Sequence, residues 1–302
     1  MTWKKIMLRI GLVVLGLAVV VGATGFYIYH QVAETTSTIY QPIEKTTKRN
    51  APLNMNEKNP FSVLLLGVDK RPGDKGRSDS LMVMTVNPTK HTTKIISIPR
   101  DTRTEIVGKN SVDKINHAFA FGGIQMTVNT VEKFLNIPID YYLEVNMEGF
   151  KDIVDAIGGV EVMNTLDFTN DGFHFKKGLL SLNGEKALSF SRMRYEDPQG
   201  DFGREARQRQ IIQEVINKGT KIKSLVSYKD ILNSINKNLE TNFTMQQMFE
   251  IQKDYRGATA SIEQQQLQGS GKMIKGIYYY LVPEKNRLAL SNELRDQLGL
   301  AQ

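Results

Sequence analysis

Hydrophobic and polar positions divide this chain into three parts. Residues 10–28 (IGLVVLGLAVVVGATGFYI) are nineteen residues without a charge, close to the ~20 apolar residues that a helix needs to span a bilayer. Residues 30–59 are polar, rich in Thr and weakly periodic. From residue 60 onward, short apolar runs alternate with amphipathic stretches. The pattern predicts a transmembrane helix, a stalk and one folded domain.

Charges on either side of the apolar segment predict its orientation. Lys4, Lys5 and Arg9 precede it, whereas the nearest ionisable residues after it are His30 and Glu34, so the N-terminus is expected in the cytoplasm. A signal peptide cleaved near residues 21–23 (VGA) is the alternative, but the segment exceeds the usual length of a secretory apolar region. We therefore predict a cytoplasmic tail (1–9), an uncleaved signal-anchor (10–29), a stalk (30–59) and an extracytoplasmic domain (60–302).

Strand and helix patterns alternate within the domain. Residues 61–67 (FSVLLLG) have the continuous apolar character of a strand buried on both faces. Residues 81–86 and 93–98 flank an Asn-Pro turn and predict a hairpin in which Val86 lies opposite Thr93. Helices are predicted at 123–135, 147–159, 204–218, 228–236, 244–255 and 289–298. Further strands are predicted at 139–145, 260–267 and 276–282. The expected fold is a single three-layer α/β/α domain with a mixed central sheet.

The predicted hairpin register places possible site residues at one edge of the sheet. If Val86 pairs with Thr93, Asp79 comes opposite Arg100. Asp69 joins the same edge if the 61–67 strand runs antiparallel beside this hairpin. Two carboxylates and an arginine would then lie together.

Charged residues also share one stripe of the helix predicted at 204–218. At 100° per residue, Arg204, Arg207 and Gln208 lie on the stripe that contains Ile211 and Val215 two turns later. Arg209 and Glu205 fall outside this stripe and are predicted to be ordinary surface residues. The stripe is either a protruding, solvated helix end or a set of inward-facing cations that needs anionic partners.

Composition narrows the class of partner. The net charge is +7 and the sequence pI is about 9.3, which favours nucleic acid, an anionic membrane surface or a phosphorylated substrate. The predicted topology removes nucleic acid from these. The chain has no cysteine, which excludes disulfides, a thiolate nucleophile and a cysteine-ligated metal.

Phosphate and a divalent cation are the ligands that fit the remaining candidates. Guanidinium groups bind phosphate oxygens in bidentate geometry. Carboxylates among arginines can hold a Mg²⁺ ion that bridges phosphate oxygens, and they can equally form salt bridges. The candidates are Asp69, Arg77, Asp79, Arg100, Arg192, Arg194, Asp201, Arg204, Arg207 and Gln208.

Six ordered segments resemble the signature blocks of the LytR-CpsA-Psr family. They are FSVLLLGVDKR, GRSDSLMVMTVNP, ISIPRDT, DKINHAFAFGG, LNGEKALSFSRMR and GDFGREARQRQ, and they span roughly residues 60–220. Such proteins are membrane-anchored, extracytoplasmic phosphotransferases. They move a glycopolymer, here expected to be wall teichoic acid, from undecaprenyl pyrophosphate to the muramic acid 6-hydroxyl of peptidoglycan.

The resemblance implies a role for each candidate. Asp69 and Asp79 match the acidic pair at the cation, Mg²⁺ or Mn²⁺, and with Arg100 they are the expected catalytic residues. The residues matching the pyrophosphate site are Arg77, Arg100, Arg192, Arg194, Asp201, Arg204, Arg207 and Gln208. Asp69 or Asp79 could accept the proton of the attacking hydroxyl, although a metal-bound carboxylate is a weak base. The polyprenyl tail is expected in an apolar cavity between the sheet and the helices of residues 114–157.

Three other functions remain open from the sequence. The same cations would serve a hydrolase of the lipid pyrophosphate, and a non-catalytic polymer-binding module could carry similar residues. A membrane-bound regulatory or attenuator protein is the third possibility, although the predicted topology argues against direct contact with DNA.

Overall fold

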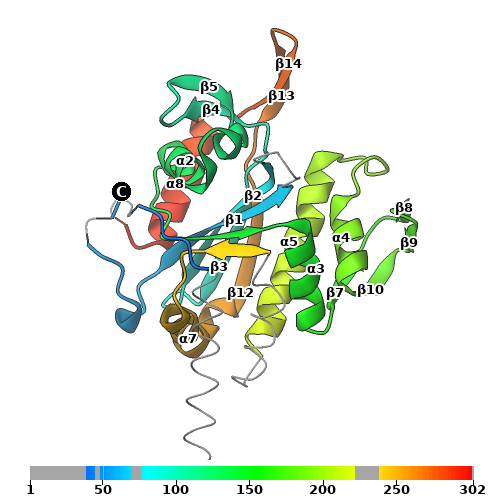
Figure 1. Ribbon diagram of the computed structural model, residues 1–302, viewed down its shortest axis with the longest axis horizontal. Helices are drawn as coiled ribbons and strands as arrows, with labels where there is room; N and C mark the ends of the chain where they lie inside the picture. The colour runs from blue at the N-terminus through cyan, green and yellow to red at the C-terminus, as the bar shows by residue number, and fades with distance from the viewer. Residues whose placement is uncertain (1–38, 45–47, 50, 70–75, 222–237, 301–302) are drawn as a thin grey trace, which may run out of the picture.

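A computed structural model of the protein describes residues 39–44, 48–49, 51–69, 76–221 and 238–300 (Figure 1). The predicted signal-anchor (10–29) and the predicted helix at 228–236 lie outside these residues. Within the described ranges, no helix combines the length and the apolar character needed to cross a membrane.

A six-stranded mixed sheet forms the centre of the domain, in the order β11-β6-β1-β2-β3-β12. Its strands are β1 (Phe61–Asp69), β2 (Arg77–Asn87), β3 (Thr92–Ser97), β6 (Tyr141–Val145), β11 (Leu239–Thr241) and β12 (Ser261–Gln266). β1 runs parallel to β6, and β3 runs parallel to β12, whereas the other neighbours are antiparallel. Val86 pairs with Thr93, so the predicted hairpin register is confirmed.

Helices cover both faces of this sheet (Figure 1). On one face, α2 (His117–Leu135) and α8 (Glu284–Gln297) pack on alternate residues of β1 such as Leu64 and Leu66. The opposite face is covered by α3 (Met147–Ala156), α5 (Asp201–Gly219) and α7 (Met245–Asp254). The predicted mixed α/β architecture is thus confirmed.

The cavity expected between the sheet and the helices of residues 114–157 stays a prediction, because these helices cover different faces of the sheet. α2 and α3 lie on opposite faces of the sheet, so they do not enclose one space. Beneath α2, the core residues Val128, Val131 and Leu135 are at most 2% exposed and pack against the strands. The α2 side is a filled core.

A second, smaller core lies beside the sheet. The helices α4 (Gly184–Arg192) and α5 enclose it with two hairpins, β7 (Val160–Asn164) with β10 (Gly178–Leu182) and β8 (Phe168–Asn170) with β9 (Phe173–Phe175). Phe168, Phe175 and Phe190 stack within it. α5 therefore has a packed neighbour on two sides, the central sheet and this smaller core.

Two further hairpins project from the end of the sheet at which β1 finishes (Figure 1). They are β4 (Arg103–Ile106) with β5 (Ser111–Lys114) and β13 (Ser270–Ile274) with β14 (Ile277–Leu281). The α2 helix follows the first of them and is interrupted at Gly122 and Gly123. Gly123 has φ 63° and ψ −152°, a conformation restricted to glycine.

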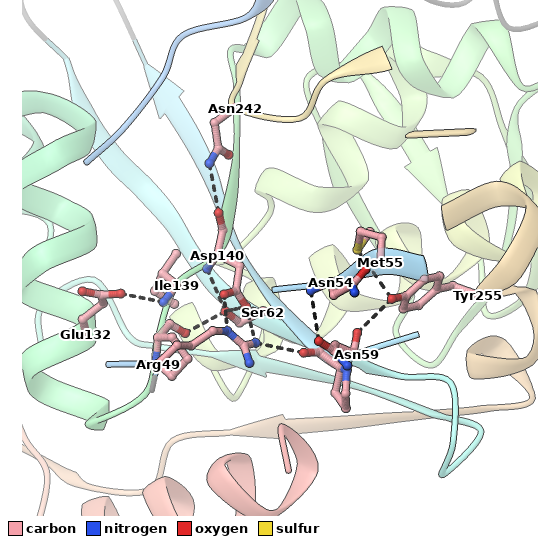
Figure 2. Close-up of polar contacts among 12 residues, drawn as sticks. Arg49, Asn54, Met55, Asn59, Ser62, Glu132, Ile139, Asp140, Asn242 and Tyr255 are labelled. Carbon is pink, nitrogen blue, oxygen red and sulfur yellow. Dashed lines mark hydrogen bonds and ion pairs between the residues drawn. The ribbon is translucent and has the colours of Figure 1, made fainter. Parts of the chain in front are cut away.

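Residues that we expected in the stalk pack against the opposite end of the sheet. Arg49 binds both carboxylate oxygens of Asp140, at 2.5 and 2.7 Å, and donates to the Pro60 carbonyl (Figure 2). Met55 is buried among Phe61 and Tyr255, and the Tyr255 hydroxyl donates to the Asn59 carbonyl. Part of the stretch 30–59 therefore belongs to the folded unit.

Candidate functional site

The candidate site lies at one end of the central sheet, where four elements meet. Asp69 closes β1, Asp79 lies near the start of β2, Arg100 follows β3, and Arg204 is in the first turns of α5. The β1–β2 register slips between Gly67 and Val68, because Gly67 pairs with Ser80 and Val68 pairs with Ser78. Asp79 is therefore the extra residue of a β-bulge. Bulges commonly redirect a side chain near a functional site.

Two arginines converge on Asp79. Arg100 Nη1 lies 2.6 Å from Asp79 Oδ1, which confirms that the hairpin brings these residues together. Arg204 Nη2 donates to the Asp79 backbone carbonyl at 3.1 Å and lies 3.0 Å from Asp201 Oδ1. Asp201 Oδ2 in turn is 3.8 Å from Arg100 Nε. The four residues Asp79, Arg100, Asp201 and Arg204, here called the arginine–aspartate cluster, form one connected set.

Burial and charge act differently on the two arginines of the cluster. Desolvation opposes the charge of Arg100, but its hydrogen bond to Asp79 and the nearby charges of Asp201 and Asp101 raise its pKa. Desolvation lowers the pKa of Arg204, partly offset by Asp201. The side chain of Arg204 is 10% exposed, whereas that of Asp79 is 41% exposed. Arg204 is thus the buried part of the cluster, and Asp79 lies at its solvent-exposed side, here called the open rim.

Asp101 and Lys114 extend the cluster and were missed in the sequence. Lys114 Nζ binds Asp101 Oδ1 at 2.6 Å, and Asp101 Oδ2 is 3.9 Å from Arg100 Nε. Asp101 lies in the signature block ISIPRDT, but no periodic pattern in the sequence indicates that it contacts Lys114. Only the hairpin β4–β5, which sequence patterns did not predict, brings the two together.

Gln208 and Arg77 lie on either side of the cluster. The Ser80 hydroxyl donates to Gln208 Oε1 at 2.9 Å, and Gln208 Nε2 reaches the Ser191 carbonyl at 3.5 Å. Arg77 is exposed and stands opposite Asp69 in the β1–β2 ladder. Both residues therefore occupy the same end of the sheet as the cluster.

Arg192 and Arg194 end α4 and start the loop that leads to α5. Arg192 is exposed. Arg194 Nη2 donates to the Tyr195 hydroxyl at 2.7 Å, and its guanidinium lies over the Tyr195 ring. Within the described residues, no hydrogen bond or ion pair joins them to the cluster, so their role at a pyrophosphate stays a prediction.

Arg207 faces the smaller core instead of the arginine–aspartate cluster. Its Nε donates to the Phe190 carbonyl at 3.0 Å, Nη1 binds Asp197 at 2.5 Å, and Nη2 donates to the Met193 carbonyl. The side chains of Arg207 and Asp197 are 8% and 4% exposed. The guanidinium thus holds both the end of α4 and the 193–197 segment against α5.

Glu205 and Arg209 are buried, so the prediction that they are ordinary surface residues is wrong. They are 5% and 8% exposed and face β3 and β12, where Arg209 Nη1 donates to the Ser97 hydroxyl at 2.6 Å. The Gln266 amide donates to Glu205 at 3.0 Å. The helical projection assumed one buried stripe, but α5 is enclosed on two sides.

Burial also gives Glu205 an unusual protonation equilibrium. Desolvation, followed by the charge of Asp201, raises the pKa of Glu205 to about 7, against the opposing effect of Arg204, Arg209 and Arg100. A carboxyl group that is half protonated near neutral pH therefore lies directly beneath the cluster. No residue pattern in the sequence distinguished it from the neighbouring charges.

The site offers hard oxygen donors for a divalent cation, although few of them. Asp69 and Asp79 occupy the same sheet end, and Arg100 contacts one of the two Asp79 oxygens. In the described part of the chain, no group of three or more His, Asp or Glu side chains is arranged to hold a metal. Mg²⁺ commonly binds one or two carboxylates together with substrate phosphates and water. The residues present fit that mode.

Comparisons with known proteins agree with the geometry. The sequence profile of the LytR_cpsA_psr family matches residues 26–296. The chain is 49% identical over 296 residues to the polyisoprenyl-teichoic acid–peptidoglycan teichoic acid transferase TagU of Bacillus subtilis (strain 168), covering 98% of this chain and 97% of that protein.

Solved structures give the same relationship. The crystal structure of B. subtilis TagU matches with a TM-score of 0.66 and 48% identity, covering 81% of this chain and 99% of that one. A structure of TagT bound to LIIa-WTA matches with a TM-score of 0.73 and 31% identity, covering 85% of this chain and 97% of that one. The chain therefore belongs to the LytR_cpsA_psr family, whose signature blocks its sequence resembles.

Proposed function

We propose that this protein is a polyisoprenyl-teichoic acid–peptidoglycan teichoic acid transferase. The observation that carries the proposal is the convergence of Arg100 and Arg204 on Asp79, within a family member 49% identical to a transferase of that name. Two arginines held by carboxylates beneath an open rim form a preorganised site for a diphosphate.

The arginines would act on the leaving group. The oxygen of a sugar hydroxyl, expected to be the 6-hydroxyl of muramic acid, forms a bond to the phosphorus that carries the polymer. The bridging P–O bond of the pyrophosphate breaks, and polyprenyl phosphate leaves with the electron pair. Arg100 and Arg204 stabilise the negative charge that develops on that phosphate. The hydroxyl proton passes to a carboxylate, for which Asp69 and Asp79 are the candidates.

A divalent cation completes the proposed site. Asp69 and Asp79 would hold Mg²⁺, or Mn²⁺ in its place, and the ion would supply charge neutralisation for the phosphate oxygens. Arg77, which is exposed and stands opposite Asp69, adds a cation beside these carboxylates.

The polyprenyl chain is proposed to lie on the face of the sheet that α5 and α7 cover. Leu65, Met84 and Leu143 project from this face and are only partly buried, although they belong to the middle strands. Apolar side chains left partly exposed at the centre of a sheet favour an apolar ligand. The helix α3, which lies within residues 114–157, covers the same face and packs Ile153 near Leu143.

We also propose that the domain lies outside the cell, anchored by residues 10–29, with the N-terminus in the cytoplasm. The positive flank of Lys4, Lys5 and Arg9 supports this orientation. A protease applied to intact protoplasts should remove the domain. A protected domain would contradict both this location and access to peptidoglycan.

Reconstitution tests the proposed reaction. The full chain is incorporated into vesicles with a polyprenyl-pyrophosphate-linked teichoic acid precursor, and peptidoglycan is added from outside. Formation of a covalent phosphodiester between polymer and glycan is expected for the wild type and not for Asp79→Ala. Release of polymer without linkage would indicate a lipid pyrophosphate hydrolase instead. Full linkage by Asp79→Ala would rule out the proposed site.

A further inference from the structure

The β13–β14 hairpin exposes apolar side chains without packing against the central sheet. It forms a separate two-stranded sheet, and its turn consists of Lys275 and Gly276, both at positive φ. Met273, Ile277 and Tyr278 are 60%, 48% and 43% exposed. A projecting ribbon with several exposed apolar residues commonly marks an interaction surface.

The root of this hairpin is fixed to the arginine–aspartate cluster from two sides. The Tyr280 amide donates to the Asp101 carbonyl at 2.8 Å, one residue after Arg100. The Tyr280 ring meets the Phe202 ring edge-on at 5.5 Å, one residue after Asp201. The hairpin therefore stands at a defined position on the rim of the site, and Figure 1 shows it projecting beyond the end of the sheet.

The two faces of the hairpin differ in their surroundings. Tyr279 belongs to the face that meets β4–β5, where its hydroxyl donates to Asp113 at 3.3 Å and Arg103 lies 5.7 Å from its ring. Met273 and Tyr278 form a cross-strand pair on the other face. A Cβ added at Gly271 would lie 2.5 Å from the Tyr278 hydroxyl oxygen and 2.7 Å from a ring carbon. The Tyr278 ring thus rests on the bare backbone of Gly271, with its outer side accessible.

We propose that this second face, with Met273, Tyr278 and Lys275 of the adjoining turn, binds the peptidoglycan glycan strand that accepts the polymer. An aromatic ring held flat with a free face offers stacking to the C–H face of a sugar, and its hydroxyl offers a hydrogen bond. Lys275 is exposed, and its charge complements the carboxylates of peptidoglycan stem peptides. This inference rests on the proposed function, since it assigns a surface to its acceptor.

The position of the hairpin favours an acceptor in the cell wall over a membrane surface. Tyr40 joins the domain through a bridge to Thr241 of β11, at one lateral edge of the sheet. β12, which leads into the hairpin, forms the opposite lateral edge. The hairpin therefore lies on the side away from the point where the predicted signal-anchor joins the domain.

Binding to wall material tests the inference directly. The full chain in detergent is sedimented with insoluble peptidoglycan sacculi from which wall polymers have been removed, without any lipid-linked donor. The variant Met273→Ala/Tyr278→Ala removes one partly exposed aromatic ring and its neighbour. Its binding to sacculi is expected to be weaker by about fivefold or more. Met163→Ala/Leu179→Ala is the matched control, because these residues are 58% and 65% exposed on another two-stranded sheet. Equal binding by the variant and the wild type would overturn the inference.

Two further measurements separate binding from folding and from a membrane contact. Tyr278→Trp should retain binding, and Lys275→Glu should weaken it, with unchanged thermal unfolding. Tyr278→Trp in a Trp3→Phe background, placed in vesicles of brominated lipid, should keep its fluorescence, whereas quenching would assign the hairpin to the membrane and overturn the proposal. In the transfer assay, the hairpin variant should raise the acceptor KM and leave kcat unchanged. Because sacculus binding needs no donor, it decides the inference even if the wild type transfers nothing.

Discussion

Arg100 Nη1 lies 2.6 Å from Asp79 Oδ1, and this ion pair joins the segment after β3 to the bulge of β2. The two residues are twenty-one positions apart, yet the antiparallel hairpin returns one to the other. Arg204 from α5 reaches the same bulge through the Asp79 carbonyl. Three separate segments thus place two cations around Asp79, one on its carboxylate and one on its backbone carbonyl, which is the geometry expected of a preorganised anion site.

Removing either partner of this pair should impair transfer more than stability. Arg100→Ala and Asp79→Ala are each expected to lower the transfer rate by about 10²–10³-fold, the loss typical of a group that stabilises developing charge. Because the Asp79 side chain is 41% exposed, the free energy of unfolding should change by only about 1 kcal/mol or less. Initial rates in the vesicle assay and urea unfolding measure the two effects.

Lys90→Ala supplies the control for these substitutions. It removes a partly exposed ion pair of similar length, 2.7 Å to Asp296, from the turn between β2 and β3. Transfer should be unaffected. An equal loss of activity in Lys90→Ala would show that any disturbed ion pair, rather than this site, is responsible.

Replacing Arg207 should impair stability more than transfer. Arg207→Ala leaves Asp197 buried without its cation and removes donors to two backbone carbonyls, so we expect a destabilisation of about 3–5 kcal/mol. Arg192→Ala, at an exposed position on the adjoining helix, should change the free energy of unfolding by about 0.5 kcal/mol or less. Urea unfolding midpoints decide this, and similar midpoints for both variants would contradict a structural role for Arg207.

The central sheet could be predicted because strand signals and register are local. The alternation in residues 81–86 and 93–98, with one Asn-Pro turn between them, is enough to place Val86 opposite Thr93 and hence Asp79 near Arg100. The start of α2 was less predictable. Its apolar periodicity begins after Gly123, and the six preceding residues form a separate helical segment joined across the glycine break.

Charged residues of α5 could not be assigned from the sequence for a physical reason. A single inward stripe assumes one packed face, but α5 lies between the central sheet and the smaller core. Arg204 and Gln208 contact β2, Arg207 contacts the smaller core, and Arg209 contacts β3. The neighbour that each arginine contacts depends on tertiary packing, and it cannot be deduced from the periodicity or the charge of the helix.

A divalent cation should stabilise the protein when a phosphate ligand is present. Binding at a hundred times the dissociation constant stabilises the folded state by about 2.7 kcal/mol, so Mg²⁺ with inorganic pyrophosphate should raise the melting temperature measurably. The shift should disappear in Asp69→Asn/Asp79→Asn. Glu105→Gln, which alters an exposed ion pair with Lys133, should retain it. Loss of the shift in both variants would argue against a site at Asp69 and Asp79.

Mn²⁺ gives a readout that does not depend on melting. Its free-ion electron paramagnetic resonance signal decreases as the ion binds, so titration of the wild type with pyrophosphate should reveal bound Mn²⁺. An Asp69→Asn/Asp79→Asn protein that binds Mn²⁺ as tightly as the wild type would place the cation elsewhere.

Glu205 should make stability depend on pH in the neutral range. Burial raises its pKa to about 7, whereas an unfolded-state glutamate titrates near the ordinary value of about 4.3. Below pH ~4 both states are protonated and the shift has no effect. As the pH rises toward 7, the unfolded state loses its proton first, so the folded state becomes less stable by as much as about 4 kcal/mol. Above pH ~7 Glu205 is deprotonated in both states, and its effect on stability changes no further.

Glu205→Gln should remove this dependence, because glutamine keeps an oxygen that accepts from the Gln266 amide and carries no proton equilibrium. The difference in unfolding free energy between variant and wild type should therefore grow in favour of the variant from pH 5 to pH 7.5. Taking the difference cancels the contributions of other titrating groups. Glu214→Gln, on the same helix, is the control, and its curve should run parallel to that of the wild type. If urea unfolding across this pH range gave a Glu205→Gln curve that is also parallel to the wild-type curve, the raised pKa of Glu205 would be refuted.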